Sequence, residues 1–433
     1  MSMKRVGIIG GGISGLGAAW LLDEECEVIL FEKRNYLGGH AHSTYVETEE
    51  GLIPIETGFE FFNNDIHPHL FRLLDILQIA TRPYPFTYTF FSEQKNSAYI
   101  LPPIQNGKIL WRMFTPRKLP LFLQLKYVLD KSSTIVKNKN TESTLEQFLD
   151  NLWVTDSFKN DFFFPLFCAG WGATPNDFKK FSTYNLFSWE IDNKSMGLTD
   201  CYWDEIITGV SSYIDALSKQ INRATIHTNA SILNISYDSG KYTISQDNGN
   251  VTVVDQLIVA TNAYEAHNLL KGIPEMHELN SLLNQLEHIK AILAIHGDIR
   301  FMPPCKSDWS IANVYYNGIE SALTTYKPWK SKIPLFRSWI MPGFPEPEPL
   351  YSSHDYYYAK ITPHYFETQR ALRPLQGRHN LWLAGIYTHG IDSHESALVS
   401  AMKIAKKLAP DSQRYKLLCG NGHQCELVQP LSV

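Results

Sequence analysis

Residues 6–15 read VGIIGGGISG, and residues 28–32 read VILFE. An apolar run of strand length leads into a Gly-x-Gly-x-x-Gly turn, after which apolar residues recur at helical spacing. The second apolar run then ends on Glu32. We therefore predict a strand, a tight glycine turn, a helix and a second strand that ends on an acid.

Each glycine of this turn has a distinct structural role. Gly10 permits the sharp turn out of the strand, Gly12 lets the backbone approach a pyrophosphate closely, and Gly15 lets the helix pack against the strand. Ile13 and Ser14 lie where the helix begins, and its free N–H groups and partial positive charge favour phosphate there. The turn is therefore a candidate site for a dinucleotide.

Glu32 lies where a carboxylate can accept hydrogen bonds from both hydroxyls of a ribose that lacks a 2′-phosphate. The alternative is a glycine-rich turn that binds nothing. We disfavour that alternative because the preceding strand, the following helix and the acid all stand at the expected distances.

A second glycine loop follows, since residues 32–40 read EKRNYLGGH. A simple nicotinamide dehydrogenase does not need such a loop, whereas a flavin site uses it to lay backbone beside a bulky ring. At this point the chain resembles the FAD-dependent amine-oxidase-like superfamily, which carries Glu-x-Arg-x-x-x-Gly-Gly after its first dinucleotide unit. Residues 55–59, IETGF, resemble the short acid-x-Gly segment of that superfamily, with Glu56 in place of the usual Asp.

The resemblance implies an α/β fold with two domains. One is a Rossmann-like FAD-binding domain of the glutathione-reductase and amine-oxidase type, and the other is a discontinuous α+β substrate domain. We assign residues 1–83, 209–262 and 377–412 to the FAD-binding domain, residues 84–208 and 263–376 to the substrate domain, and residues 413–433 to a C-terminal tail.

The sequence also predicts individual elements. Apolar spacing predicts a helix over residues 67–79, and strands are expected over residues 84–91, 226–235, 242–245, 251–254, 257–262, 291–296 and 356–359. Residues 381–385, LWLAG, indicate a buried strand that ends in glycine. Asp392 and Glu395 are spaced as a capping box for a helix that runs to about Leu408.

The resemblance places the start of this last helix at the pyrimidine edge of the flavin. A helix N-terminus stabilises negative charge by roughly 0.3–1 kcal/mol, and up to ~2 kcal/mol when partly buried, which favours an anionic reduced flavin. Matching the motifs residue by residue gives the expected cofactor-binding residues: Gly10, Gly12, Ile13, Ser14, Gly15, Glu32, Lys33, Arg34, Gly38, Gly39, His40, Glu56, Thr57, Gly58, Phe59, Ile232, Gly385, Ile386, Tyr387, His394, Glu395 and Ala397.

Several positions depart from the amine oxidases. His40 stands where the superfamily has the arginine of a Gly-Gly-Arg sequence, and Ile386 and Tyr387 stand where an acid usually meets the ribityl chain. Residues 384–397 contain no cysteine, so we expect non-covalent FAD rather than a thioether linkage. Lys290 is near in sequence to the lysine that those enzymes place beside flavin N5.

The middle and end of the chain resemble one branch of the superfamily, the predicted FAD-binding oxidoreductases associated with fatty-acid-modifying methyltransferases. The resemblance is carried by residues 296–298 (HGD) with residues 302–303 (MP) and Trp309, by residues 364–369, and by residues 390–395. It implies a role in fatty-acid modification.

Composition limits the class of protein. The 433 residues suffice for two domains, and a net charge of −5 gives no global field for nucleic acid. Six cysteines spread over this length do not form a disulfide framework, and we expect no metal site. The first strand begins too early for a signal peptide, and no apolar run reaches the roughly eighteen residues of a membrane span. These features predict a cytoplasmic protein.

Two segments leave alternatives open. Residues 104–139 are basic and apolar, with Asp130 as nearly their only acid. They form either a helical layer with a solvated basic face or a peripheral contact with an anionic membrane surface. Beyond Pro410, Cys419, His423 and Cys425 could bind a metal, but a loose tail is the simpler interpretation.

The predicted function is that of an FAD-dependent oxidoreductase that removes a hydride from an apolar, fatty-acyl substrate. The alternatives are an amine oxidase and a protein that holds FAD as a scaffold or binds lipid without turnover. Aromatic-rich residues 84–91, 162–171 and 356–366 can build a pocket for either substrate. The acid–base candidates are the histidines near the expected flavin, namely His40, His42, His296 and His394. Substrate identity, electron acceptor and oligomeric state do not follow from the sequence.

Overall fold

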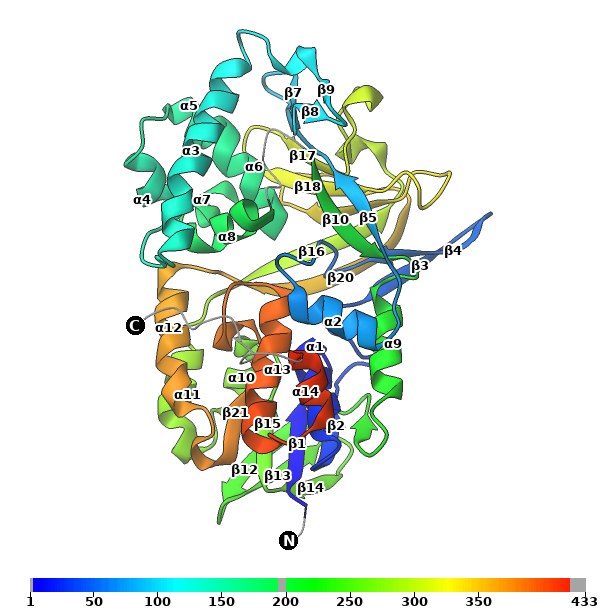
Figure 1. The fold of residues 1–433 in the computed structure, drawn as a ribbon, viewed down its shortest axis with the longest axis vertical. Coiled ribbons are helices and arrows are strands. Elements are labelled where there is room, and N and C mark those ends of the chain that lie inside the picture. The colour runs from blue at the N-terminus through cyan, green and yellow to red at the C-terminus, as the bar shows by residue number, and fades with distance from the viewer. Residues whose placement is uncertain (1–2, 194–199, 421–433) are drawn as a thin grey trace.

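The computed structural model describes residues 3–193 and 200–420. Figure 1 shows two bodies stacked along the long axis, each built around its own sheet. The chain crosses between the two bodies several times, so neither of them is continuous in sequence.

The lower body contains a five-stranded parallel sheet with the strand order β11-β2-β1-β15-β21. Its central strand pairs on both sides. Apart from the edge strand β11, the strands are buried almost throughout, as parallel strands covered on both faces usually are. The bounds are β1 (Arg5–Ile9), β2 (Glu27–Phe31), β11 (Thr225–His227), β15 (Gln256–Val259) and β21 (Leu381–Leu383).

Helices cover one face of this sheet and a second sheet covers the other. The helices α1 (Ile13–Leu22) and α13 (His394–Leu408) pack together in one apolar cluster with β1. On the opposite face lies the antiparallel sheet of β12 (Ile232–Asp238), β13 (Lys241–Gln246) and β14 (Val251–Val254). A Cβ at Gly7 would lie 2.9 Å from Ile244 Cδ1, so this sheet packs closely over β1 where the chain has glycine.

The upper body is built on a seven-stranded sheet with the order β20-β16-β19-β18-β17-β6-β7, in which only β17 and β6 are parallel (Figure 1). The bounds are β6 (Tyr88–Ser92), β7 (Ser97–Leu101), β16 (His288–His296), β17 (Ala312–Tyr316), β18 (Ser321–Tyr326), β19 (Phe336–Ile340) and β20 (Leu350–Ala359). Strands β5 (Thr81–Phe86) and β10 (Cys201–Ile206) pair antiparallel beside it, and β3 (Ser43–Thr48) and β4 (Gly51–Glu56) form a hairpin.

The remaining helices are grouped by body. The upper ones gather beside the seven-stranded sheet in Figure 1: α3 (Leu119–Lys137), α4 (Leu145–Asp150), α5 (Asp156–Phe158), α6 (Phe164–Cys168), α7 (Pro175–Phe178) and α8 (Thr183–Asn193). The lower ones are α2 (Pro68–Ile76), α9 (Val210–Lys219), α10 (Ala263–Leu270), α11 (His277–Leu283), α12 (Pro363–Leu372) and α14 (Gln413–Cys419).

Four local expectations need correction. The expected strand over residues 84–91 is divided between β5 and β6, which belong to different sheets. The expected strand over residues 226–235 is divided between β11 and β12, which belong to different sheets. Residues 104–139 begin with two short strands, β8 (Ile104–Gln105) and β9 (Lys108–Ile109), before α3. The prediction of a loose tail is wrong for residues 413–419, because α14 buries Tyr415 and Leu418 against the helical core. His423 and Cys425 lie outside the described residues.

Within residues 3–193 and 200–420, none of the helices has both the length and the apolarity needed to cross a bilayer.

Candidate active site

A cavity of about 670 Å³ extends from the glycine turn at the end of β1 to the seven-stranded sheet. Its lower wall contains residues 10–14, 32–34, 38–41, 230–232 and 260–263. Its upper wall contains side chains of β17, β18, β19 and β20. A single cavity therefore joins the dinucleotide loop to the upper sheet.

The glycine turn is shaped by close contacts within the protein. A Cβ at Gly15 would lie 1.8 Å from the carbonyl oxygen of Gly10, so α1 can approach the turn only with glycine at that position. Gly10 itself has φ +108, a conformation that L side chains rarely adopt. The second loop is bonded to the first, since Gly38 N donates to Gly11 O at 2.8 Å.

Gly12 differs from these neighbours because its missing side chain faces the cavity. A Cβ there would meet no protein atom nearer than Gly38 O at 4.0 Å. The space beside Gly12 is therefore free for a ligand that approaches the N-terminus of α1 closely.

Glu32 is buried and lies in the cavity wall. Its Oε2 accepts a hydrogen bond from Gly11 N at 2.7 Å and its Oε1 accepts one from Arg34 N at 2.8 Å. Each oxygen keeps further acceptor capacity, so the carboxylate is held in place and still able to receive hydroxyl donors. Ala230 N bonds to the carbonyl of the same residue at 2.9 Å, which brings the start of β12 to this end of the cavity.

Most of the expected cofactor-binding residues line this cavity, but four do not. Gly15 is covered by the turn. Thr57 shares a 2.9 Å hydrogen bond with the hydroxyl of Tyr356. Glu395 accepts from the backbone N–H groups of His69 and Leu70 at 3.0 Å and so caps α2.

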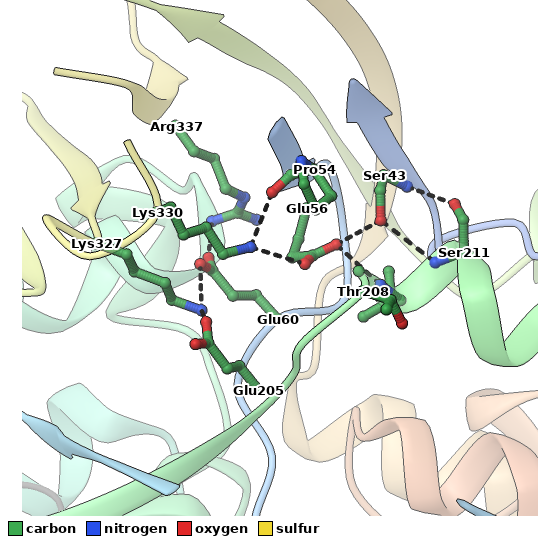
Figure 2. A network of polar contacts seen from close by, with 12 residues as sticks. Ser43, Pro54, Glu56, Glu60, Glu205, Thr208, Ser211, Lys327, Lys330 and Arg337 are labelled. Carbon is green, nitrogen blue, oxygen red and sulfur yellow. Dashed lines mark hydrogen bonds and ion pairs between the residues drawn. The ribbon is translucent and has the colours of Figure 1, made fainter. Parts of the chain in front are cut away.

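Glu56 is the fourth of these residues and belongs to a separate polar network (Figure 2). It accepts from the Ser43 hydroxyl at 2.6 Å and from Val210 N at 3.2 Å, and it pairs with Lys330 at 3.2 Å. Its role in this structure is to tie β4 to α9 and to the segment after β18.

The two residues that follow Gly385 reach the cavity, and neither of them is an acid. Ile386 and Tyr387 both line it, and the Tyr387 hydroxyl lies 3.5 Å from Val259 O. The Ser14 hydroxyl donates to Ala397 O at 3.1 Å, which joins the first turn of α1 to α13. Lys290 is at the surface and pairs with Asp355 at 3.0 Å, so it does not line the cavity.

The predicted capping box is wrong. Helix α13 is capped by Ser393, whose hydroxyl accepts from Ser396 N at 3.0 Å. The preceding Asp392 instead accepts from the indole N–H groups of Trp171 and Trp189, the second at 3.0 Å. Burial raises the pKa of Asp392, and the indole hydrogen bonds only partly offset this effect.

Two of the candidate histidines line the cavity. His40 stacks on Tyr356 with ring centroids 4.8 Å apart, and burial, with the charge of Arg34, lowers its pKa to about 4. His394 stacks on Phe59 at 4.0 Å and its Nε2 is 2.5 Å from the Tyr213 hydroxyl. Burial lowers the pKa of His394 well below its usual value, so both rings are neutral near pH 7.

The other two candidate histidines lie outside the cavity wall. His296 is fully buried, shares a 2.8 Å hydrogen bond with Ser338 and accepts from Asp298 N at 3.0 Å. His42 is 3.0 Å from the Thr57 hydroxyl. Both positions are explained by packing and hydrogen bonding. His288, which no sequence motif marked, does line the cavity.

The upper wall is predominantly aromatic, which gives the cavity an apolar surface facing the loops. Its aromatic members include Phe61, Phe86, Tyr88, Phe167, Trp171, Trp189, Trp203, Trp339, Tyr356, Tyr357 and Tyr358. Sequence reasoning anticipated some of these through the aromatic-rich stretches, but not Trp189, Trp203 or Trp339.

A glycine turn and a buried, anchored acid that open into an aromatic cavity are typical of a flavoprotein oxidoreductase. Residues 13–297 match the family of flavin containing amine oxidoreductases, and the chain belongs to that family. It is an FAD-dependent oxidoreductase of the amine-oxidase type.

Comparisons with individual proteins agree with this fold. Cyclohexylamine oxidase from Brevibacterium oxydans IH-35A is similar with a TM-score of 0.68 and 16% identity, over 94% of this chain and 99% of that one. A fatty acid isomerase from P. acnes that produces CLA has a TM-score of 0.67 and 13% identity, over 93% and 98% of the two chains. A segment of 154 residues is 30% identical to 4,4'-diaponeurosporene oxygenase of Staphylococcus haemolyticus (strain JCSC1435), which is 35% of this chain and 26% of that relative.

The residues present fit FAD. The open face of Gly12 and the start of α1 suit a pyrophosphate, and the anchored carboxylate of Glu32 suits a ribose. The neighbouring His40 and His394 are held in neutral form, so these two rings add no charge to the cavity.

Proposed function

We propose that the protein removes a hydride from an apolar acyl-chain substrate that is held against the aromatic wall. The observation that supports this proposal is the continuity of one cavity from the FAD-type loops to a wall of aromatic side chains. A methylene chain gains roughly 0.8 kcal/mol per buried CH₂ in such surroundings and gains little from hydrogen bonds.

In this proposal the bound FAD supplies the two-electron acceptor chemistry. The protein binds and orients the substrate through Trp339, Tyr356 and Tyr358, and the buried rings exclude water from the reacting end. The N-terminus of α13, which reaches the cavity at Ser393 and His394, stabilises negative charge that develops beside it. His40 and His394 stay neutral because of their lowered pKa values, so they add no charge where they line the cavity.

Oxidation of an amine is the second candidate, and the surroundings of Asp392 favour it. This half-buried carboxylate lines the cavity, and the indole N–H groups of Trp171 and Trp189 that donate to it are neutral. A carboxylate held only by neutral indole donors can still pair with an ammonium group. The oxidised carbon would then lie beside a nitrogen held by Asp392.

Membrane contact through residues 104–139 is part of the same proposal. Trp111, Leu123 and the nearby Trp153 are exposed by 73%, 60% and 94%, which is unusual for large apolar side chains. Thr155 N donates to Gln124 Oε1 at 2.7 Å, so the loop that carries Trp153 lies against α3. The segment is strongly basic in a protein of net charge −5, which makes an anionic bilayer the complementary surface.

Anaerobic titration distinguishes the candidates. Purified holoenzyme is mixed with a panel of fatty acyl lipids and a panel of alkyl and aryl amines, and loss of the flavin absorbance near its visible maximum is followed. We expect bleaching by acyl lipids. Bleaching by amines alone would refute the acyl proposal, and bleaching by neither panel would favour a protein that holds FAD without turnover.

A further inference from the structure

Arg337 is a buried cation in an otherwise aromatic part of the cavity wall. It is 4% exposed, lies on β19 and lines the cavity together with Trp339, whose ring centroid is 5.2 Å from its guanidinium carbon. Nη2 donates to Gly58 O at 3.1 Å and Nη1 lies 3.3 Å from Glu60 Oε2. Its Nε has no hydrogen-bond partner among the described residues.

Glu60 does not neutralise Arg337 fully, because it also forms an ion pair with Lys327 (Figure 2). Glu60 Oε1 is 3.2 Å from Lys327 Nζ, while its Oε2 faces Arg337 and also accepts from the Thr325 hydroxyl at 3.3 Å. Burial alone raises the pKa of Glu60, but the charges of Lys327 and Arg337 hold that pKa below its usual value. The carboxyl is therefore ionised and shared between two cations.

The charges continue in alternation from the cavity to the surface. Lys327 Nζ lies 3.5 Å from Glu205 Oε2, and Glu205 pairs with Arg82, whose side chain is 47% exposed. The row therefore holds three cations, at Arg337, Lys327 and Arg82, and two anions. The adjacent pair of Lys330 and Glu56 is balanced and leaves this excess unchanged.

The row of charged residues ends in water at Arg82 and ends away from water at Arg337, beside the cavity. Arg82 is partly in water and is paired with Glu205. Arg337 is buried, and the single carboxylate that pairs with it among the described residues, Glu60, is shared with Lys327. A buried cation that is incompletely paired is costly, and a ligand anion that enters the cavity would complete its pairing. A planar carboxylate also matches the guanidinium geometry.

We propose that Arg337 binds the carboxylate of the substrate, so that the compound oxidised is an acyl chain with a free acid group. This inference rests on the proposed function, because it names the head group of the apolar substrate. It assigns to Glu60 the role of a positioning residue that holds the guanidinium and weakens its attraction for other anions.

The test compares octanoate with methyl octanoate at neutral pH. Binding to the holoenzyme is measured by the change in tryptophan fluorescence, since Trp171, Trp189 and Trp339 line the cavity. We expect octanoate to bind at least about tenfold more tightly than the ester, a difference of ~1.4 kcal/mol. Arg337→Gln should abolish this preference, and Glu60→Gln should increase it, because Arg337 then loses its competing anion.

The opposite signs of the two variants separate recognition from a structural role, which would lower the preference in both. Arg378→Gln is the matched control, since Arg378 pairs with Glu278 at the surface and does not line the cavity. If Arg337→Gln does not fold, the response of Glu60→Gln decides, and no increase in preference there would contradict the proposal.

Three other results would overturn the inference. Equal affinity of the wild type for acid and ester would refute it while leaving the apolar-substrate proposal intact. Absence of binding by both compounds would refute the inference together with that proposal. A change in the flavin spectrum of Arg337→Gln with an unchanged acid-to-ester ratio would show that Arg337 contacts the cofactor instead.

Discussion

Replacement of Gly12 by alanine should separate cofactor binding from folding. Gly12 is the N-cap of α1 with φ −73 and ψ −179, an extended conformation that alanine adopts without strain. The new methyl group would meet no protein atom closer than 4.0 Å. It would instead occupy the space that the pyrophosphate needs.

The two expected costs differ in size. Alanine is a poorer N-cap than glycine, which lowers the free energy of unfolding of the apoprotein by no more than about 1 kcal/mol. Displacing the phosphates from the start of α1 removes at least one charge-assisted hydrogen bond, worth roughly 1.5–3 kcal/mol, so the Kd for FAD should rise roughly ten- to hundredfold.

Gly15→Ala provides the contrast, because its methyl group would lie 1.8 Å from Gly10 O and must displace the turn. We expect the free energy of unfolding of Gly15→Ala to fall by about 1–3 kcal/mol or more, as in overpacked variants. The variant should also lose FAD binding. The assay is fluorescence titration of apoprotein with FAD, with urea unfolding of both apoproteins. Unchanged FAD affinity in Gly12→Ala, or equal destabilisation of the two variants, would refute this assignment.

Three further predictions concern stability and surface contact. Glu395→Gln should lower the free energy of unfolding by about 1–2 kcal/mol in urea titration, because it weakens the cap on the N–H groups of His69 and Leu70. Burial lowers the pKa of His67 to about 4, so the unfolded chain binds more protons between that value and about pH 6.5 and stability should fall as the pH drops through this window. His67→Phe keeps an aromatic ring between Phe59 and Trp189 and should reduce the change of the urea midpoint with pH in this window. An unchanged pH dependence of the urea midpoint would contradict the assignment. The double variant Trp111→Ala/Trp153→Ala should co-sediment several-fold less than wild type with vesicles that contain phosphatidylglycerol. The control is Leu233→Ala, which removes an apolar side chain that is 75% exposed on another part of the surface. Equal sedimentation of the double variant and the control would contradict membrane contact.

Features encoded by neighbouring residues could be predicted from the sequence. The strand, turn and helix around Gly10 and Gly15 are present, and Glu32 ends β2 as expected. These elements depend on local spacing and backbone sterics, which a short stretch of sequence contains. The prediction of an FAD-dependent amine-oxidase fold is also confirmed, because residues 13–297 match the family and a solved amine oxidase has a similar fold.

Contacts between distant segments could not be predicted in the same way. Glu395 had the spacing of a capping box, but the unpaired N–H groups of α2, more than three hundred residues earlier, compete successfully for its carboxylate. Nothing near Arg337 in the sequence marks it, because its partners Gly58 and Glu60 come from the other end of the chain. The assignment of individual cofactor contacts and of the domain boundaries stays a prediction.

The two indole hydrogen bonds to Asp392 bear on how a substrate enters. Asp392 precedes a helix of the lower body, while Trp171 and Trp189 belong to the helical part of the upper body. A hinge motion that separated the bodies would remove both indole donors from the half-buried Asp392 carboxylate, which costs about 1–3 kcal/mol for each lost hydrogen bond to a charged group. Exchange of substrate should therefore use rotation of side chains at the cavity edge, with the two bodies remaining together throughout the catalytic cycle.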